Sequence, residues 1–213
     1  MERIFLGYDP GGKKANGAAI LRLSGPSKSC SFDVHTFDSI DEVIRWFKND
    51  IGPISPQAAG IDTFLSWATT QSGWRPMDEY LRETYLKVQR SVLSSNSAAG
   101  AMGIQDMAMA LQLKQIWPDI KLNETHPKVL YYAIAGKPYK FGEPLAQWLS
   151  KQIGVTGLNI KKKIKNEHEW DALISAWATR QGLDGKWNKD LMKSNGSQTL
   201  LFPAGPATYF WPG

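Results

Sequence analysis

The chain has 213 residues, of which 42% are hydrophobic and 21% are charged, and its formal net charge is +5. These values are ordinary for a soluble globular protein, and no apolar run reaches the length that a membrane span requires. The mild positive charge permits a polyanionic partner without requiring one.

The first predicted elements form an antiparallel meander of strands. The apolar segment at residues 3–9 predicts a buried strand that ends in Asp9, and a turn after it leads into a second strand at residues 17–23. A more polar segment at residues 31–37 predicts an edge strand. The segments between them are short and carry turn-forming residues, so we expect hairpin connections.

A helix and a fourth strand follow the meander. Ser39 and Glu42 have the spacing of a capping box, and apolar residues recur after them at helical intervals. Residues 57–62 then predict a short apolar strand that ends in Asp62. The fourth strand therefore ends in an acid, as the first one does.

The second half of the chain alternates helices with one more strand. Residues 120–125 predict a fifth strand, with Glu124 near its end. The tail includes a short apolar run at residues 200–202 that predicts a further short strand. The predicted helices of this half cover residues 77–88, 101–117, 127–136, 143–152 and 167–180.

We expect one domain over residues 1–213, because the sequence contains no internal repeat and no low-complexity linker. It carries a helical insertion at about residues 66–118 and an irregular tail at about residues 188–213. The first residues do not resemble a signal peptide. The single cysteine, Cys30, cannot form an internal disulfide, so we expect a reducing, cytoplasmic setting.

This order of elements predicts an α/β fold. A meander, a helix and then strands alternating with helices produce a five-stranded mixed sheet in the order 3-2-1-4-5, flanked by helices. In this order the ends of the first and fourth strands are neighbours, about 4.8 Å apart. Asp9 and Asp62 are therefore expected to project side by side, with Glu124 flanking them.

Another carboxylate lies on the last predicted helix. Asp171 follows His168 by one helical turn, so both side chains can share a face of the helix. Carboxylates at the ends of elements need a reason to be there, and a shared divalent metal ion is the usual one. Each also has a structural alternative: Asp9 as a turn acid, Asp62 as a cap, Glu124 as an exposed strand end and Asp171 as a first-turn helix acid.

Several of these segments resemble motifs of ribonuclease H-like nucleases. Residues 7–11, followed by the small residues 17–19, resemble the first motif of the branch that contains the RuvC Holliday-junction resolvases. The pattern His168-x-x-Asp171-Ala172 is similar to the motif on the last helix of that branch.

More closely, the chain resembles a family of predicted ribonuclease H-like proteins known as domain of unknown function 429. Residues 61–65, 124–127 and 171–173 are similar to its later motifs, and the resemblance extends in islands over residues 3–182. The sequence departs from the family pattern at Thr63, at Phe64 and at Lys128.

The resemblance implies a divalent-metal-dependent nuclease that hydrolyses phosphodiester bonds of DNA or RNA. Such nucleases bind two Mg²⁺ or Mn²⁺ ions through three or four carboxylates. His126 is then expected to position Glu124 or a phosphate, or else to cap a helix, and His168 to orient water or a phosphate, or else to lie at a solvated helix end. The metal ligands implied by the resemblance are Asp9, Asp62, Glu124 and Asp171.

Two basic segments are candidates for contacts with a nucleic-acid backbone. The first contains Lys13 and Lys14, in the turn after the first strand. Runs of lysine are also typical of solvated loops, so phosphate contact is a hypothesis for both segments. The second segment comes just before the last helix and comprises Lys161, Lys162, Lys163 and Lys165.

Two other functions fit parts of the sequence. A non-catalytic nucleic-acid-binding or regulatory protein would retain the fold without cleaving its partner. An actin-like-superfamily phosphotransferase would share the core topology and the segment at residues 9–12, but it requires a second lobe that the sequence does not contain. The sequence does not distinguish DNA from RNA and does not indicate an oligomeric state, although a junction resolvase would need to form a homodimer.

Overall fold

The structure is a computed structural model that describes the following residues: 2–24, 29–62, 64–96, 100–141, 148, 151–152, 164–193 and 200–213. The helix predicted at residues 143–152 lies largely outside the described residues, and Lys161, Lys162 and Lys163 lie wholly outside them.

A six-stranded mixed sheet forms the centre of the fold. The first three strands pair antiparallel, and the other three run parallel to β1. The α/β class is confirmed, and so is the predicted order of the first five strands, although a sixth strand from the tail extends the sheet. The strands are, in spatial order, β3 (Ser29–Phe37), β2 (Asn16–Ser24), β1 (Arg3–Asp9), β4 (Ala58–Asp62), β6 (Lys121–Thr125) and β9 (Ala207–Thr208).

Helices and two small sheets complete the described part of the chain. The helix predicted at residues 77–88 is divided into α2 and a 3-10 helix, η1. None of the described helices is long and apolar enough to cross a membrane. The helical elements are α1 (Ile40–Ile51), α2 (Pro76–Thr84), η1 (Leu86–Ser91), α3 (Gly100–Ile116), α4 (Pro127–Ala135) and α7 (Glu167–Leu183). The small sheets pair β5 (Trp67–Ala68) with β8 (Leu200–Leu201), and β7 (Lys189–Asp190) with β10 (Phe210–Trp211).

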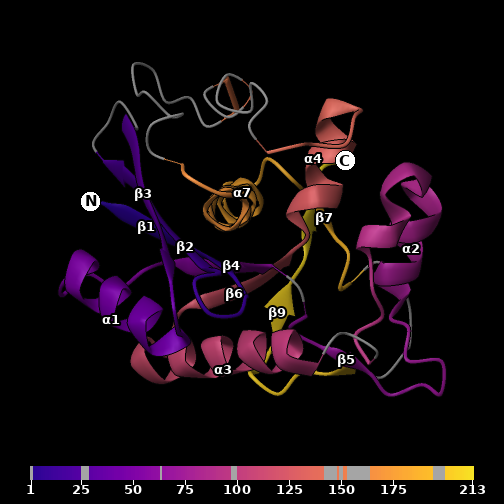
Figure 1. Ribbon diagram of the computed structural model, residues 1–213, viewed down its shortest axis with the longest axis horizontal. Coiled ribbons are helices and arrows are strands. Elements are labelled where there is room, and N and C mark those ends of the chain that lie inside the picture. The colour runs from indigo at the N-terminus through magenta and orange to yellow at the C-terminus, as the bar shows by residue number, and fades with distance from the viewer. Residues whose placement is uncertain are drawn as a thin grey trace.

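Both faces of the central sheet are covered. Figure 1 shows α7 on one side of the sheet and α1 and α3 on the other. Side chains alternate between the faces of a strand, so Phe5 of β1 packs in the core that includes Ala172 of α7. Ile4 and Leu6 pack in the opposite core, which includes Val43 of α1 and Met109 of α3. The sheet is therefore buried on both faces, and side chains at the ends of its strands are held between layers.

Glycines on three adjacent strands allow α7 to approach the sheet closely. A Cβ atom on Gly7, Gly17 or Gly60 would overlap a backbone carbonyl oxygen of α7. Gly7 and Gly60 lie side by side in the register of β1 and β4, so the two glycines together form one flat surface against which the helix packs. The close approach of α7 thus depends on these residues having no side chain.

Hydrogen bonds fix α7 against β6. The hydroxyls of Ser175 and Thr125 lie 2.7 Å apart, and Nδ2 of Asn123 donates to Oγ1 of Thr179 at 3.1 Å. These groups are buried, and buried polar groups are normally paired in this way. The middle of α7 is consequently held in a defined position next to β6.

Candidate metal centre

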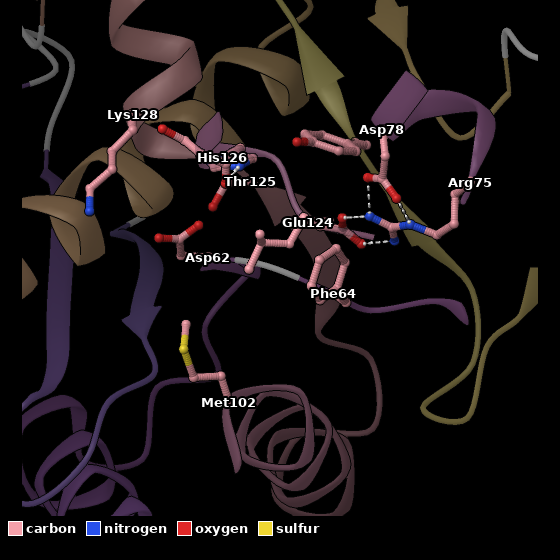
Figure 2. Close-up of a pocket in the computed structure, with 12 residues that line it drawn as sticks. Asp62, Phe64, Arg75, Asp78, Met102, Glu124, Thr125, His126 and Lys128 are labelled. Carbon is pink, nitrogen blue, oxygen red and sulfur yellow. Dashed lines mark hydrogen bonds and ion pairs between the residues drawn. The ribbon is translucent and has the colours of Figure 1, made fainter. Parts of the chain in front are cut away.

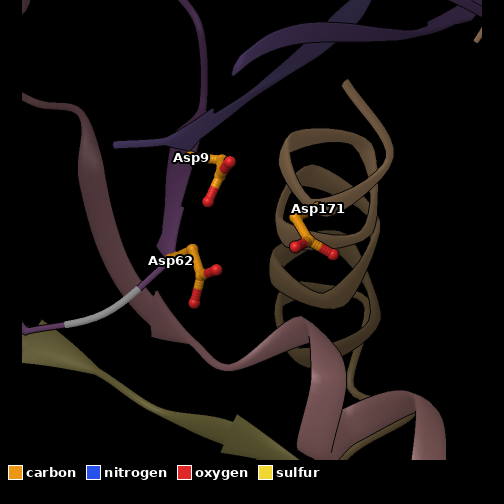
Figure 3. A group of neighbouring side chains, drawn as sticks. All are labelled: Asp9, Asp62 and Asp171. Atoms are coloured by element: carbon orange, nitrogen blue, oxygen red, sulfur yellow. The ribbon is translucent and has the colours of Figure 1, made fainter. Parts of the chain in front are cut away.

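Three aspartates from three elements meet at the start of α7 (Figure 3). Asp9 is the last residue of β1, Asp62 is the last residue of β4, and Asp171 lies near the start of α7. One oxygen of each lies within 4.8 Å of the others, and the three residues are 6%, 9% and 3% exposed, respectively. The structure therefore brings together three of the four carboxylates that the sequence indicated as metal ligands.

The three carboxylates are in electrostatic conflict. Burial and the negative charges of Asp9 and Asp171 raise the pKa of Asp62 well above its usual value. Burial and the charge of Asp9 do the same to the pKa of Asp171. The Oδ1 atom of Asp62 is buried and has no hydrogen-bond partner among the described residues. A cation would relieve the repulsion among these buried acids and give the unpaired oxygen a partner, so the donor set fits a divalent metal ion.

His168 contacts the centre through Asp9. Its Nδ1 atom lies 2.6 Å from Oδ2 of Asp9, and the ring is partly exposed. This hydrogen bond is the main reason that the pKa of His168 is raised, and it opposes the increase that burial causes in the pKa of Asp9. The structure thus places His168 beside the three aspartates, bonded directly to one of them.

Two residues that the sequence patterns did not indicate as site residues also lie beside Asp171. The Tyr139 hydroxyl donates a hydrogen bond of 2.6 Å to Oδ1 of Asp171, and it lies 3.3 Å from Oε1 of Glu167. Lys128 Nζ lies 2.7 Å from the same Glu167 oxygen. Lys128 follows the end of β6 closely, which is a positional signal for it, whereas Tyr139 follows α4 without any local pattern.

Glu124 does not join the three aspartates, which corrects the expectation that it flanks them. Its carboxylate accepts hydrogen bonds from Arg75 at 2.6 and 2.8 Å and from the Leu65 amide at 2.8 Å. The reason is the register of the sheet, in which Asp62 pairs with Thr125 and Ile61 pairs with Glu124. Since side chains alternate between faces, Thr125 points towards α7 and Glu124 points to the other face.

Arg75 is the centre of the buried ion-pair network that includes Glu124. Its side chain is fully buried, and its guanidinium also bonds both carboxylate oxygens of Asp78, at 2.7 and 2.8 Å. The aromatic ring of Phe64 lies against it, with 4.7 Å between Cζ and the ring centroid. Sequence patterns did not indicate Arg75, since an arginine next to Pro76 at the start of α2 has no feature that separates it from a surface residue.

His126 is the N-cap residue of α4, as one of its two expected roles required, although its side chain makes no capping hydrogen bond and does not bond Glu124. Its Nε2 atom lies 3.0 Å from the Ser91 carbonyl oxygen, and its Nδ1 atom is buried without a hydrogen-bond partner in the described part of the chain. Burial lowers the pKa of His126 to about 4, so the ring is neutral at neutral pH and Nε2 is the protonated nitrogen that donates to Ser91.

A pocket of about 170 Å³ opens beside Asp62 (Figure 2). It extends from the metal centre to the Arg75 network, so one continuous space touches both features. The lining residues are Asp62, Phe64, Arg75, Asp78, Ser91, Leu93, Met102, Glu124, Thr125, His126, Lys128 and Tyr209.

The described lysines of the basic segments lie at the surface. Lys13 and Lys14 are exposed in the turn between β1 and β2, and Lys14 has a positive φ of 62°. Lys165 is exposed just before α7, where its backbone amide donates to Oε2 of Glu169 at 2.6 Å. Their contact with phosphate stays a prediction.

Comparisons with known proteins agree with this architecture. No family model matches the sequence, and no curated protein is significantly similar to it. Among solved structures, the chain is similar to one titled "Thermus thermophilus RuvC structure", with a TM-score of 0.50 and 14% identity, over 87% of this chain and 97% of that chain. The resemblance to domain of unknown function 429 stays a prediction, whereas the resemblance to the RuvC branch is supported at the level of the fold. The fold of this protein is ribonuclease H-like.

Proposed function

We propose that this protein is a divalent-metal-dependent nuclease that hydrolyses phosphodiester bonds of DNA or RNA. The observation that carries the proposal is the meeting of Asp9, Asp62 and Asp171. These three buried carboxylates repel one another, and one oxygen of Asp62 has no hydrogen-bond partner among the described residues. The ribonuclease H-like fold supports the proposal because the sequence motifs of its nucleases coincide here with the residues that meet.

The donor set suits hard divalent cations. Carboxylate oxygens are the ligands that Mg²⁺ and Mn²⁺ prefer, and the three aspartates would hold one or two such ions. Bound ions of this kind activate a water for attack on phosphorus and stabilise the charge on the leaving oxygen.

The other residues of the site orient these ligands. His168 holds Oδ2 of Asp9 at 2.6 Å, and Tyr139 holds Oδ1 of Asp171 at 2.6 Å, so each fixes the orientation of an aspartate that would bind the metal. Such partners fix ligand orientation in metal sites. Lys128 is half exposed beside the aspartates and supplies a positive charge for a phosphate oxygen.

We propose that the substrate backbone follows the two basic segments of the sequence. Lys13 and Lys14 lie in the turn that directly follows Asp9 and its neighbours in the chain, and the second basic segment precedes α7. These residues would neutralise phosphates on either side of the scissile bond without reading sequence. The second segment comprises Lys161, Lys162, Lys163 and Lys165.

Cleavage of labelled substrates tests the proposal. The panel contains single-stranded DNA and RNA, duplexes, an RNA–DNA hybrid and a four-way junction, each with Mn²⁺, with Mg²⁺ or with EDTA. We expect metal-dependent cleavage by the wild type and none by Asp9→Asn or Asp171→Asn, while Asp119→Asn, a change at an exposed acid, behaves as the wild type.

Calorimetric titration of Mn²⁺ into the same proteins measures metal binding separately from cleavage. Binding by the wild type that disappears in Asp9→Asn and Asp171→Asn would establish the carboxylates as ligands. Nucleic-acid binding without metal-dependent cleavage of any substrate would favour the non-catalytic alternative, and cleavage that survives in Asp9→Asn would contradict the proposed site.

A further inference from the structure

We infer that the pocket beside Asp62 receives one unpaired nucleobase of the substrate, next to the scissile phosphate. The inference rests on the proposed function and adds the class of substrate to it: a nucleic acid with at least one nucleotide outside a duplex.

The position of the pocket links it to the metal centre. Asp62 belongs both to the group of aspartates and to the pocket wall, and Lys128 lines the pocket as well. Figure 2 shows these two residues at one side of the pocket and the Arg75 network at the other. A phosphate held between the metal centre and Lys128 would therefore place its neighbouring nucleotide at the pocket.

The charges of the pocket favour a neutral group over a phosphate. At its far side the single positive charge of Arg75 is opposed by two carboxylates, those of Glu124 and Asp78, both bonded to it at 2.6 to 2.8 Å. At the near side, Asp62 and Lys128 both line the pocket. The far side therefore offers an anion no net positive charge, whereas its carboxylate oxygens can accept hydrogen bonds from the N–H donors of a base.

The lining has the two characters that a nucleobase requires. Phe64, Leu93 and Met102 supply apolar surface for the faces of a heterocycle. His126 and Tyr209 add polar groups to the same wall, and Nδ1 of His126, which surrounding atoms cover, has no hydrogen-bond partner among the described residues. Base recognition in nucleic-acid enzymes combines such apolar surfaces with a few hydrogen bonds.

The pocket is small. Its volume is about 170 Å³, whereas pockets that bind drug-sized ligands have volumes of about 300–1,000 Å³. The space therefore suits one heterocycle. A base enclosed by protein on these sides cannot also pair with a complementary strand, so the nucleotide must be single-stranded, looped out or flipped.

Binding in EDTA tests the inference without metal-dependent cleavage. The probes are DNA and RNA oligonucleotides with 2-aminopurine unpaired in a single-nucleotide bulge, and matched duplexes with the same 2-aminopurine paired. We expect the bulged probe to bind at least about tenfold more tightly, with a change in 2-aminopurine fluorescence that the paired probe does not show.

Two tryptophan substitutions on α3 form a matched pair. Met102 lines the pocket, whereas Leu111 lies in a separate apolar surface of the same helix, and both side chains are exposed. Met102→Trp is expected to fill the pocket and to abolish the preference for the bulged probe, while Leu111→Trp retains it. Leu93→Trp, at another exposed lining residue, repeats the test at a second position.

The outcomes separate this inference from the proposed function. Equal affinity for bulged and paired probes, or a preference that both pocket variants retain, would overturn the inference. If duplexes are then cleaved with Mn²⁺, the proposed nuclease stands and only the pocket assignment fails. Absence of binding to all probes and of metal-dependent cleavage would overturn both.

Discussion

Nδ1 of His168 lies 2.6 Å from Oδ2 of Asp9, although the two residues are 159 positions apart in the chain. The contact joins the start of α7 to the end of β1, and it occupies one carboxylate oxygen of Asp9. Because His168 is itself held on the packed helix α7, its bond to Oδ2 fixes the orientation of the whole Asp9 carboxylate. We therefore assign His168 a positioning role at the metal centre.

His168→Ala is expected to weaken Mn²⁺ binding and cleavage by about 10- to 100-fold, because a ligand that loses its orienting partner binds metal less well. Calorimetric titration and initial rates measure the two effects. His35→Ala serves as the control, since His35 is an exposed histidine of β3. Wild-type metal affinity in His168→Ala would remove the residue from the site.

Asp62→Asn is expected to stabilise the metal-free protein. The pKa of Asp62 is raised in the folded state, so its carboxyl group favours folding only while it is protonated, and this contribution is lost as the pH rises above 3.8 and through the folded-state pKa. The amide in Asp62→Asn does not ionise, so the stability of the variant does not fall with rising pH for this reason. We expect the variant to melt at least about 2 °C above the wild type at pH 8 and to show a smaller difference at pH 4.

Thermal melts with and without Mn²⁺ check the assignment of Asp62. The metal is expected to raise the melting temperature of the wild type and to leave that of Asp62→Asn unchanged. Asp119→Asn, at an exposed acid, should respond as the wild type does. A destabilised Asp62→Asn would contradict the electrostatic conflict described for the three aspartates.

Glu124→Gln should have the opposite effect on stability. It breaks a fully buried pair with Arg75, and breaking such pairs typically destabilises a protein by about 3–5 kcal/mol. Asp78 still bonds Arg75, so we expect about 3 kcal/mol, measured by urea unfolding, with Mn²⁺ affinity close to that of the wild type. Glu79→Gln, at an exposed residue of the same helix as Asp78, is the control.

The result that would contradict this prediction is a loss of Mn²⁺ binding with unchanged stability. Glu124 would then have to reach the metal centre in solution, and the sheet register would not explain its role.

Gly60→Ala is expected to move α7 away from the sheet. The new methyl group would overlap the Ser175 carbonyl oxygen, a backbone atom that cannot rotate aside. We expect a destabilisation of about 1–3 kcal/mol. We also expect weaker Mn²⁺ binding than in the wild type, since Asp171 would be displaced with the helix. Gly12→Ala, which would contact no neighbouring atom, is the matched control. Equal effects of the two substitutions would contradict the proposed close approach.

The meeting of Asp9, Asp62 and Asp171 could be predicted from the sequence because it depends on strand order and helix position. The two strands that end in Asp9 and Asp62 are parallel neighbours, so their last residues had to meet. Glu124 shows the limit of this reasoning. The order of the strands brings it to the same edge, but the register of β6 places Thr125 level with Asp62 and turns Glu124 to the opposite face.

Other parts of the site depend on tertiary contacts that leave no local pattern. Tyr139 reaches Asp171 across 32 positions of sequence, and Arg75 reaches Glu124 across 49. Neither residue lies in a motif with fixed spacing to its partner. The short strand β9 could not be predicted either, since two residues carry no periodicity and pair only because β6 offers a free edge.

The burial of α7 limits how this protein can change over evolutionary time. Residues 169–182 of the helix are all buried, and three glycines of the sheet lie so close to its backbone that no side chain would fit between them. A substitution on the helix would disturb both the core and Asp171, the proposed metal ligand. We therefore expect homologues to differ in the loops around the pocket and in the tail, and new substrate preferences to arise there while the helix itself stays nearly constant.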